Sequence, residues 1–103
     1  MRRGEIWWAD LPEPAGHRPV LLVSRDEAYA VRLFVTVAPV TTRVRDIPSE
    51  VTLGPAEGLP RPCVANLDSL QTVPKAQLGR RMTLLPAEKL TEMDEALRFA
   101  LGL

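Results

Sequence analysis

The chain has 103 residues, which is enough for one domain spanning residues 1–103 and too short for two. Its formal net charge is zero, so the total charge does not by itself demand a nucleic-acid partner. The single cysteine, Cys63, excludes an internal disulfide and fits a reducing compartment. No apolar run approaches the roughly 20 residues that span a bilayer, and no signal peptide is visible, so we expect a cytoplasmic protein.

Basic and acidic residues are unevenly distributed along the chain. Residues 1–81 carry ten arginines and one lysine against nine acids, whereas residues 86–103 carry two basic residues against four acids. Eleven of the 13 basic residues are arginine, whose planar, permanently charged guanidinium suits phosphate. The bias of a GC-rich genome explains this preference equally well, so the composition alone does not decide.

Most of the chain has the pattern of short β-strands. Ten prolines punctuate the sequence, which favours strands joined by turns, with loops at residues 12–16, 43–48 and 54–62. Residues 20–23 are apolar at every position and predict a strand buried on both faces, whereas residues 49–53 alternate and predict a more exposed one. The expected strands are Gly4–Leu11, Arg18–Ser24, Val31–Val40, Ser49–Leu53, Cys63–Val73 and Arg81–Leu85.

The last segment changes to a helical period. Apolar residues recur at helical spacing and predict one packed face, made of Leu90, Met93, Leu97 and Leu101. Pro86 suits the first turn of this helix, and Gly102 suits its end. A run of short strands followed by one amphipathic helix predicts a mainly β fold, a small and strongly bent antiparallel sheet or barrel with the helix packed on it.

The second and third strands are expected to form an antiparallel hairpin. The register that pairs Val20 with Pro39 also pairs Arg18 with Thr41, so these two polar residues meet at the open end of the hairpin. Because proline has no N–H to donate, Pro39 should lie at a sheet edge or a bulge. Bulges often lie beside active sites, where they redirect side chains.

Four blocks of sequence resemble one known family. Residues 4–11 (GEIWWADL), 16–20 (GHRPV), 38–42 (APVTT) and 66–78 (NLDSLQTVPKAQL) look, in order and spacing, like the MazF/PemK toxin endoribonucleases. The resemblance covers essentially the whole chain. It implies an SH3-like barrel that forms a homodimer, cleaves single-stranded RNA at short sequence motifs and is neutralised by a cognate, MazE-like antitoxin.

The resemblance also implies which residues are catalytic. The arginine of the family maps onto Arg18 and its threonine onto Thr41, with Thr42 as the adjacent alternative. The sequence departs from the family at residues 12–16, where many members carry a longer loop with a Ser-Glu-Gln stretch. This departure bears on the target sequence and on loop contacts to the substrate, but it does not affect Arg18.

The chemistry expected of such a site needs no metal and no cofactor. RNA carries its own nucleophile, the 2′-OH, so a protein need only position it and stabilise charge on the phosphate. Arg18 suits phosphate binding, but a guanidinium deprotonates poorly. Histidine is a common general base, and His17 either acts as one here or faces away, because neighbours on a strand face opposite sides. The expected products are a 2′,3′-cyclic phosphate (or a 3′-phosphate) and a 5′-hydroxyl.

Further residues are candidates for RNA binding. Trp7 and Trp8 are adjacent, so one should face inward, and the outward one, taken as Trp8, either stacks a base or lies under a dimer partner. The polar candidates are Thr42, Arg43, Arg45, Asn66 and Asp68. Arg43 and Arg45 either hold flanking phosphates or belong to a solvated loop, and Asn66 and Asp68 share a face if their strand is regular.

Other interpretations of the sequence stay open at this stage. Cys63 is either a nucleophile or a packed thiol, and the scattered acids with one histidine do not predict a metal site. Two other functions fit a barrel of this size. One is a toxin that inhibits gyrase without cutting nucleic acid, and the other is a non-catalytic SH3-like binding module.

Overall fold

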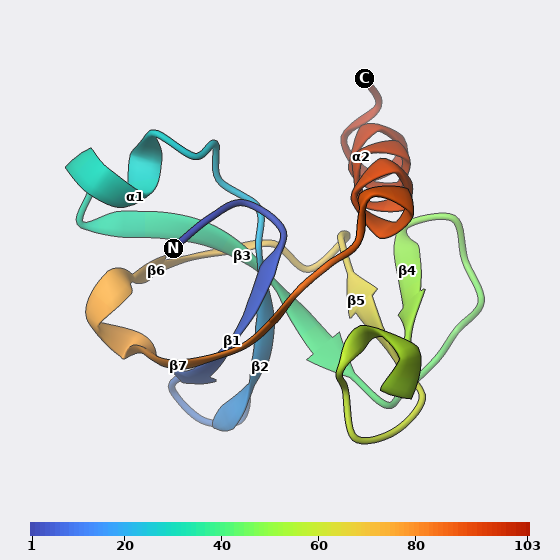
Figure 1. Cartoon of the computed structure of the whole chain (residues 1–103), viewed down its shortest axis with the longest axis horizontal. Coiled ribbons are helices and arrows are strands. Elements are labelled where there is room, and N and C mark those ends of the chain that lie inside the picture. Colours follow the sequence, from blue (N-terminus) through green and yellow to red (C-terminus); the bar gives the residue numbers. More distant parts are fainter.

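The structure is a computed structural model that describes all residues from 1 to 103. The strands lie in the order β4-β5-β3-β2-β1-β7, every pairing is antiparallel, and β6 pairs separately with β3 (Figure 1). The elements in chain order are β1 (Glu5–Asp10), β2 (His17–Leu22), α1 (Ala28–Val31), β3 (Phe34–Thr41), β4 (Glu50–Leu53), η1 (Pro55–Glu57), β5 (Cys63–Asn66), β6 (Gln71–Pro74), η2 (Lys75–Gln77), β7 (Leu78–Leu84) and α2 (Ala87–Leu101). The predicted class, a mainly β fold with a C-terminal helix, is confirmed.

Three predicted strand boundaries are wrong. The expected strand Cys63–Val73 is two strands, because the chain turns after Asn66, whose side-chain oxygen accepts the N–H of Asp68 at 2.9 Å. Val31 ends the short helix α1, and β3 begins only at Phe34. Strand β7 starts at Leu78 and is longer than expected, because it pairs with β1 over nearly the whole length of that strand.

Strand β3 bonds to three other strands. Along one edge it pairs with β2, and the predicted register of Val20 opposite Pro39 is confirmed. Along its other edge it pairs first with β6, from Phe34 to Val37, and then with β5, at Val40 and Thr41. The sheet therefore forks at residues 38–39.

Pro39 lies at this fork with its nitrogen turned into the gap. The Val23 N–H donates to the Thr36 carbonyl at 3.0 Å, which makes these two residues a hydrogen-bonded pair of the antiparallel ladder. Since such pairs alternate, Val20 and Pro39 form a non-hydrogen-bonded pair, and the Pro39 nitrogen points away from β2. Although β3 is a central strand, Pro39 thus occupies a local edge where no partner needs its N–H.

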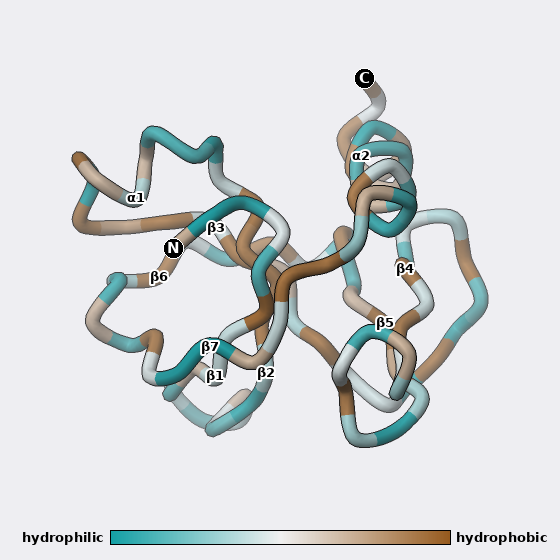
Figure 2. The backbone as a smooth tube through the Cα atoms, viewed as in Figure 1, coloured by the Kyte–Doolittle hydropathy of each residue, from teal (hydrophilic) through white to brown (hydrophobic).

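The sheet is covered by apolar side chains on both faces. One core, which includes Ile6, Leu21 and Val51, is closed by Met93 and Ala96 of α2, and the helix stands beside β4 and β5 (Figure 1). The other core lies on the opposite face and is formed by Ala9, Leu11, Val20, Leu22, Tyr29, Val35, Val37, Val73 and Leu78. Figure 2 shows the hydrophobic positions gathered where the central strands cross the molecule. The predicted burial of residues 20–23 on both faces is confirmed.

Helix α2 packs through its middle. Met93 is buried and Leu97 packs partly against the first core, but Leu101 is 54% exposed, so the predicted packed face ends one turn early. Figure 1 shows the last turn of α2 extending beyond the strands. Gly102 ends the helix with a φ of 69°, and the Leu103 N–H donates to the Arg98 carbonyl at 2.9 Å. No helix of the structure is both long and apolar enough to cross a membrane.

Gly4 allows the N-terminal segment to approach α2. Its φ is 91°, and a Cβ added at this position would overlap the Leu90 side chain. We predict that Gly4→Ala lowers the free energy of unfolding by about 2–4 kcal/mol, because backbone strain and overpacking add. Chemical denaturation measures this loss.

Two further glycines provide the controls for Gly4→Ala. Gly102 also has a positive φ but has no atom near its Cβ position, so Gly102→Ala should show backbone strain alone, about 1 kcal/mol. Gly79 has neither a positive φ nor a tight contact, and Gly79→Ala should be nearly neutral. A loss of stability in Gly4→Ala that is no larger than the loss in Gly102→Ala would contradict the predicted clash.

Candidate active site

The fork in the sheet contains a small cavity lined by three arginines. The cavity has a volume of about 300 Å³, and it is called here the arginine pocket. Its lining residues are Arg18, Pro39, Thr41, Arg43, Arg45, Asn66 and Ser69. No carboxylate lines the pocket, and none of its arginines takes part in an ion pair. The predicted proximity of Arg18 and Thr41 is confirmed.

Arg18 is oriented by the loop that precedes β2. Its Nε donates to the Ala15 carbonyl at 2.9 Å, which fixes the direction of the half-buried guanidinium. This bond uses only one of the five N–H groups and leaves both terminal nitrogens free. The end of the guanidinium can therefore hold two oxygens of one phosphate through parallel hydrogen bonds.

Thr41 ends β3 with its hydroxyl available as a donor. Its Oγ1 accepts the backbone N–H of Arg43 at 3.1 Å, a bond that stabilises the turn out of the strand. Because the oxygen acts as an acceptor in this bond, the hydroxyl hydrogen remains free. A phosphate oxygen in the pocket can accept that hydrogen.

The loop that carries Arg43 and Arg45 is held by one carboxylate. Glu50 at the start of β4 accepts the backbone N–H of Arg45 at 3.0 Å and that of Asp46 at 2.9 Å. Asp46 has a φ of 57°, so the chain turns sharply at this point. These bonds hold the loop against β4 while both arginine side chains stay exposed.

Asn66 reaches the pocket from the end of β5. Its Oδ1 accepts the Asp68 N–H, so its amide nitrogen remains free to donate into the pocket. Asp68 does not reach the pocket, because its carboxylate accepts the hydroxyl hydrogen of Ser49. Asn66 and Asp68 were expected to share a face only if their strand were regular, and this condition is not met, because the strand ends between them.

His17 lies on the opposite face of β2 from Arg18. Its ring stacks on Trp8 with the ring centroids 4.8 Å apart, and its Nδ1 lies 2.7 Å from the Asp10 carboxylate. Of the two alternatives left open by the sequence, the one in which His17 faces away is confirmed. The structure does not bring this imidazole to the arginine pocket.

The two tryptophans face opposite sides, as expected. Trp7 packs against the second core and donates its indole N–H to Glu5 at 3.1 Å. Trp8 lines a separate, mostly apolar cavity of about 170 Å³, together with Thr42 and Arg61. Thr41 lines both this cavity and the arginine pocket, so it marks the boundary between them.

Cys63 has the surroundings of a packed thiol. The residue is buried at the base of the Trp8 cavity. Burial raises the pKa of the Cys63 thiol, and the negative charge of Glu57 raises it further. The reactive thiolate form is thus disfavoured near neutral pH, and of the two interpretations of Cys63 the structure favours packing.

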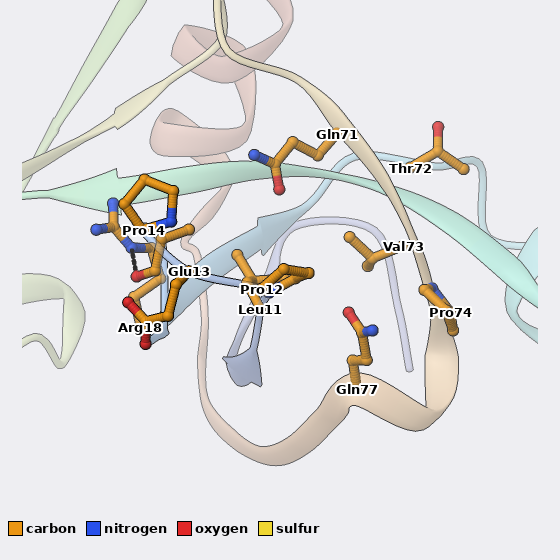
Figure 3. Close-up of a pocket in the computed structure, with 11 residues that line it drawn as sticks. Leu11, Pro12, Glu13, Pro14, Arg18, Gln71, Thr72, Val73, Pro74 and Gln77 are labelled. Atoms are coloured by element: carbon orange, nitrogen blue, oxygen red, sulfur yellow. Dashed lines mark hydrogen bonds between the residues drawn. The ribbon is translucent and has the colours of Figure 1, made fainter.

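A wide groove that the sequence did not reveal adjoins the arginine pocket. It has a volume of about 880 Å³ and lies between the β1–β2 loop and the segment formed by β6 and η2 (Figure 3). Arg18 lines both the groove and the pocket, and Glu13 lies on the same side of the groove. The Glu13 carboxylate forms no ion pair. The only feature of the sequence that points to this groove is an acid, Glu13, which lies five residues before Arg18 in the short loop of residues 12–16.

The fold and the site together define a class of protein. A bent antiparallel sheet holds unpaired guanidinium groups, a free hydroxyl and an amide around one cavity. These hydrogen-bond donors are the groups with which proteins bind a phosphodiester. No three His, Cys, Asp or Glu side chains are grouped so as to hold a metal ion. The chain belongs to the family of PemK-like, MazF-like toxins of type II toxin–antitoxin systems, whose family model matches residues 2–101.

Relatives and solved structures agree with this family. The chain is 40% identical over 104 residues to the probable endoribonuclease MazF2 of Mycobacterium tuberculosis, which covers 99% of both chains. It is 39% identical over 99 residues to the probable endoribonuclease MazF5 of the same species, which covers 95% of this chain and 90% of the relative.

Two solved structures show the same fold. The Mycobacterium tuberculosis toxin MazF-mt6 matches with a TM-score of 0.89 at 36% identity, over 96% of this chain and 97% of that one. A mycobacterial endoribonuclease in complex with its cognate antitoxin matches with a TM-score of 0.90 at 31% identity, over 100% of this chain and 96% of that one.

The contact between Glu50 and the arginine loop can be tested directly. We predict that Glu50→Gln lowers the free energy of unfolding by about 1–2 kcal/mol, because a neutral amide accepts the two backbone hydrogens less strongly. Hydrogen exchange should accelerate at the amides of Arg45 and Asp46. Glu95→Gln removes an equal charge from an exposed position of α2 and is the control. Unchanged exchange in the loop would show that Glu50 does not hold it.

Proposed function

We propose that this chain is a sequence-specific endoribonuclease toxin, an mRNA interferase, that cuts single-stranded RNA at the arginine pocket without a metal ion. The observation that carries this proposal is the placement of Arg18 and Thr41, with their donors free, in one cavity without carboxylates. Neither gyrase inhibition nor simple binding by an SH3-like module requires such a cavity. The family and the endoribonuclease relatives support the same activity.

The reaction begins with the 2′-OH of the RNA. Its oxygen attacks the adjacent phosphorus, so the O2′–P bond forms and the P–O5′ bond breaks. The 2′-OH gives up its proton, and the departing 5′-oxygen takes one up. The products are a 2′,3′-cyclic phosphate, which water can open to a 3′-phosphate, and a 5′-hydroxyl end.

The pocket lowers the barrier by stabilising charge and holding geometry. The terminal nitrogens of Arg18 bind the non-bridging oxygens, on which negative charge builds up as the O2′–P bond forms. The hydroxyl of Thr41 and the amide of Asn66 add neutral donors from the other side of the cavity. Arg43 and Arg45 hold the phosphates that flank the cut. Trp8 and Thr42 line the neighbouring cavity, where a flanking base can stack.

Proton transfer is assigned to Glu13 in this scheme. A guanidinium such as that of Arg18 gives up a proton poorly, and His17 lies on the other face of the sheet. Glu13 is the only carboxylate that lines the groove shared with Arg18, and no cation pairs with it. A carboxylate in this position can accept the 2′-OH proton as the general base.

The proposal extends to partners and location. The structure of a similar mycobacterial endoribonuclease contains its cognate antitoxin. We propose that an antitoxin also neutralises this chain, through an acidic segment that pairs with the free arginines of the arginine pocket. The family likeness supports a homodimer and one functional unit over residues 1–103. A messenger RNA substrate places the protein in the cytoplasm.

Substitutions of Arg18 and Thr41 should lower the cleavage rate by unequal amounts. Arg18→Ala should lower the single-turnover cleavage rate of a labelled oligonucleotide by about 10²–10³-fold or more, because a preorganised charged donor is lost. Thr41→Val should cost less, because it removes one neutral donor. Arg32→Ala deletes an exposed arginine far from the pocket and is the control for charge. Size-exclusion chromatography checks that each variant keeps its wild-type assembly. An Arg18→Ala protein that cuts at the wild-type rate would disprove the assignment.

Metal independence and the 2′-OH mechanism make a second prediction. Addition of EDTA should leave the cleavage rate unchanged, and replacement of the single 2′-OH at the cut by hydrogen should abolish cleavage at that bond. Mass spectrometry of the products should show a 2′,3′-cyclic phosphate and a 5′-hydroxyl. Strong inhibition by the chelator that added Mg²⁺ reverses would contradict the mechanism.

A further inference from the structure

An exposed acidic residue lies at the rim of the arginine pocket without pairing with an arginine. In the sequence, Asp68 stands between Asn66 and Ser69, which both line the pocket, and its backbone N–H donates to the Asn66 side-chain oxygen at 2.9 Å. The Asp68 carboxylate nevertheless forms no ion pair and does not line the pocket. Because arginine binds carboxylates readily through paired hydrogen bonds, another interaction must hold this carboxylate away from the guanidinium groups.

The hydroxyl of Ser49 is the group that holds this carboxylate. Ser49 directly precedes β4 and is completely buried. Its hydroxyl donates to a carboxylate oxygen of Asp68, its only hydrogen-bond partner, and its carbonyl accepts the backbone N–H of Leu67 at 2.9 Å. A buried hydroxyl has no water to replace a lost acceptor, and a charged acceptor makes the stronger bond. The bond therefore fixes the direction of the Asp68 side chain.

Ser49 stands where the two segments that line the pocket meet. The loop that carries Arg43 and Arg45 runs into Ser49, and the ladder that follows pairs Glu50 of β4 with Asn66 of β5 (Figure 1). Both arginine side chains are exposed and form no ion pair, so they are free to turn toward an anion. A carboxylate released from Ser49 would thus find cations on the pocket side of the turn.

We propose that Ser49 is a positioning residue that keeps the Asp68 carboxylate out of the arginine pocket and so leaves the arginines free for RNA phosphates. The inference rests on the proposed function, in which these arginines bind RNA. Without the Ser49 hydroxyl, the Asp68 carboxylate turns to Arg43 or Arg45 and competes there with the phosphate. Ser49 touches neither the substrate nor the reacting atoms, so its loss should weaken binding and leave the chemical step unchanged.

A hydrogen bond that served only the fold would behave differently. Its loss would loosen the two segments whatever the charge at position 68, and a neutral residue there would bring no recovery. Asp68→Asn separates the two roles, because an amide oxygen still accepts from Ser49 while the amide cannot form an ion pair with an arginine. The charge of Asp68, and not its hydrogen bond alone, is therefore the quantity to test.

The experiment is a double-mutant cycle on nucleic-acid binding. The probe is a fluorescent single-stranded oligonucleotide pool of mixed sequence with hydrogen at every 2′ position, so that it binds without being cut by 2′-OH attack. Fluorescence anisotropy at low ionic strength measures its Kd. Ser49→Ala should raise the Kd about two- to fivefold, the effect of one competing exposed ion pair. The double variant Ser49→Ala/Asp68→Asn should return to the Kd of Asp68→Asn alone.

Two further variants complete the cycle. Glu95→Gln in the Ser49→Ala background removes an equal negative charge from an exposed position of α2 and should restore nothing. Asp68→Glu changes only an exposed residue, so it tests the same idea even if Ser49→Ala folds poorly. Its longer side chain no longer fits the Ser49 bond and reaches toward the arginines, so its Kd should rise as that of Ser49→Ala does.

Cleavage kinetics on RNA with intact 2′-OH groups provide the second measurement. Ser49→Ala should raise KM by the same factor as the Kd, while kcat stays within about twofold of the wild-type value. A fall in kcat with an unchanged KM would show that Ser49 serves only the geometry of the fold and would overturn the inference.

The outcomes separate this inference from the proposed function. A wild-type protein that binds the oligonucleotide but cuts no RNA would overturn the proposed function, while the binding cycle still decides the role of Ser49. Failure of Asp68→Asn to restore binding in the Ser49→Ala background would overturn the inference even if the wild type cuts RNA. An equal gain in affinity from Asp68→Asn with and without Ser49 would also overturn it, because the hydroxyl would then not control where the charge lies.

Discussion

Strand β3 changes partner along one edge, and the rest of the structure depends on this exchange. Its first half bonds to β6 and its end bonds to β5, while β2 follows its other edge. Pro39 lies at the point of exchange and supplies no N–H to the gap between the two partners. The two parts of the sheet diverge from this point, and the space they leave contains the arginine pocket.

The same exchange determines which side chains meet in the pocket. The β2–β3 register places Arg18 and Thr41 on one face, because residues opposite each other in an antiparallel pair point to the same side. Strand β5 ends where it leaves β3, so Asn66 lies at the rim of the same cavity. A change of one residue in this register would turn Arg18 or Thr41 to the other face, where Trp8 and His17 lie.

Local patterns in the sequence were enough to predict the β2–β3 hairpin and the proximity of Arg18 and Thr41. The apolar run at residues 20–23 predicted a buried strand, and the hairpin register that brings Arg18 opposite Thr41 also pairs Val20 with Pro39, as the structure has it. The break after Asn66 was missed because Leu67 and Leu70 continue an apolar pattern, whereas the turn depends on a side-chain hydrogen bond. The groove was missed because it forms between segments far apart in the chain, and no local pattern reports it.

The zero net charge of the chain conceals how its charges are placed. Glu50 accepts two backbone N–H groups of the arginine loop, Asp68 accepts the Ser49 hydroxyl, and Glu5 pairs with Arg81 away from the pocket. These carboxylates hold the backbone and the strand edges, and none of them lines the arginine pocket around Thr41. A phosphate that enters the pocket meets guanidinium groups with no competing anion to displace. The affinity for RNA therefore depends on where the acids are engaged and not on their number.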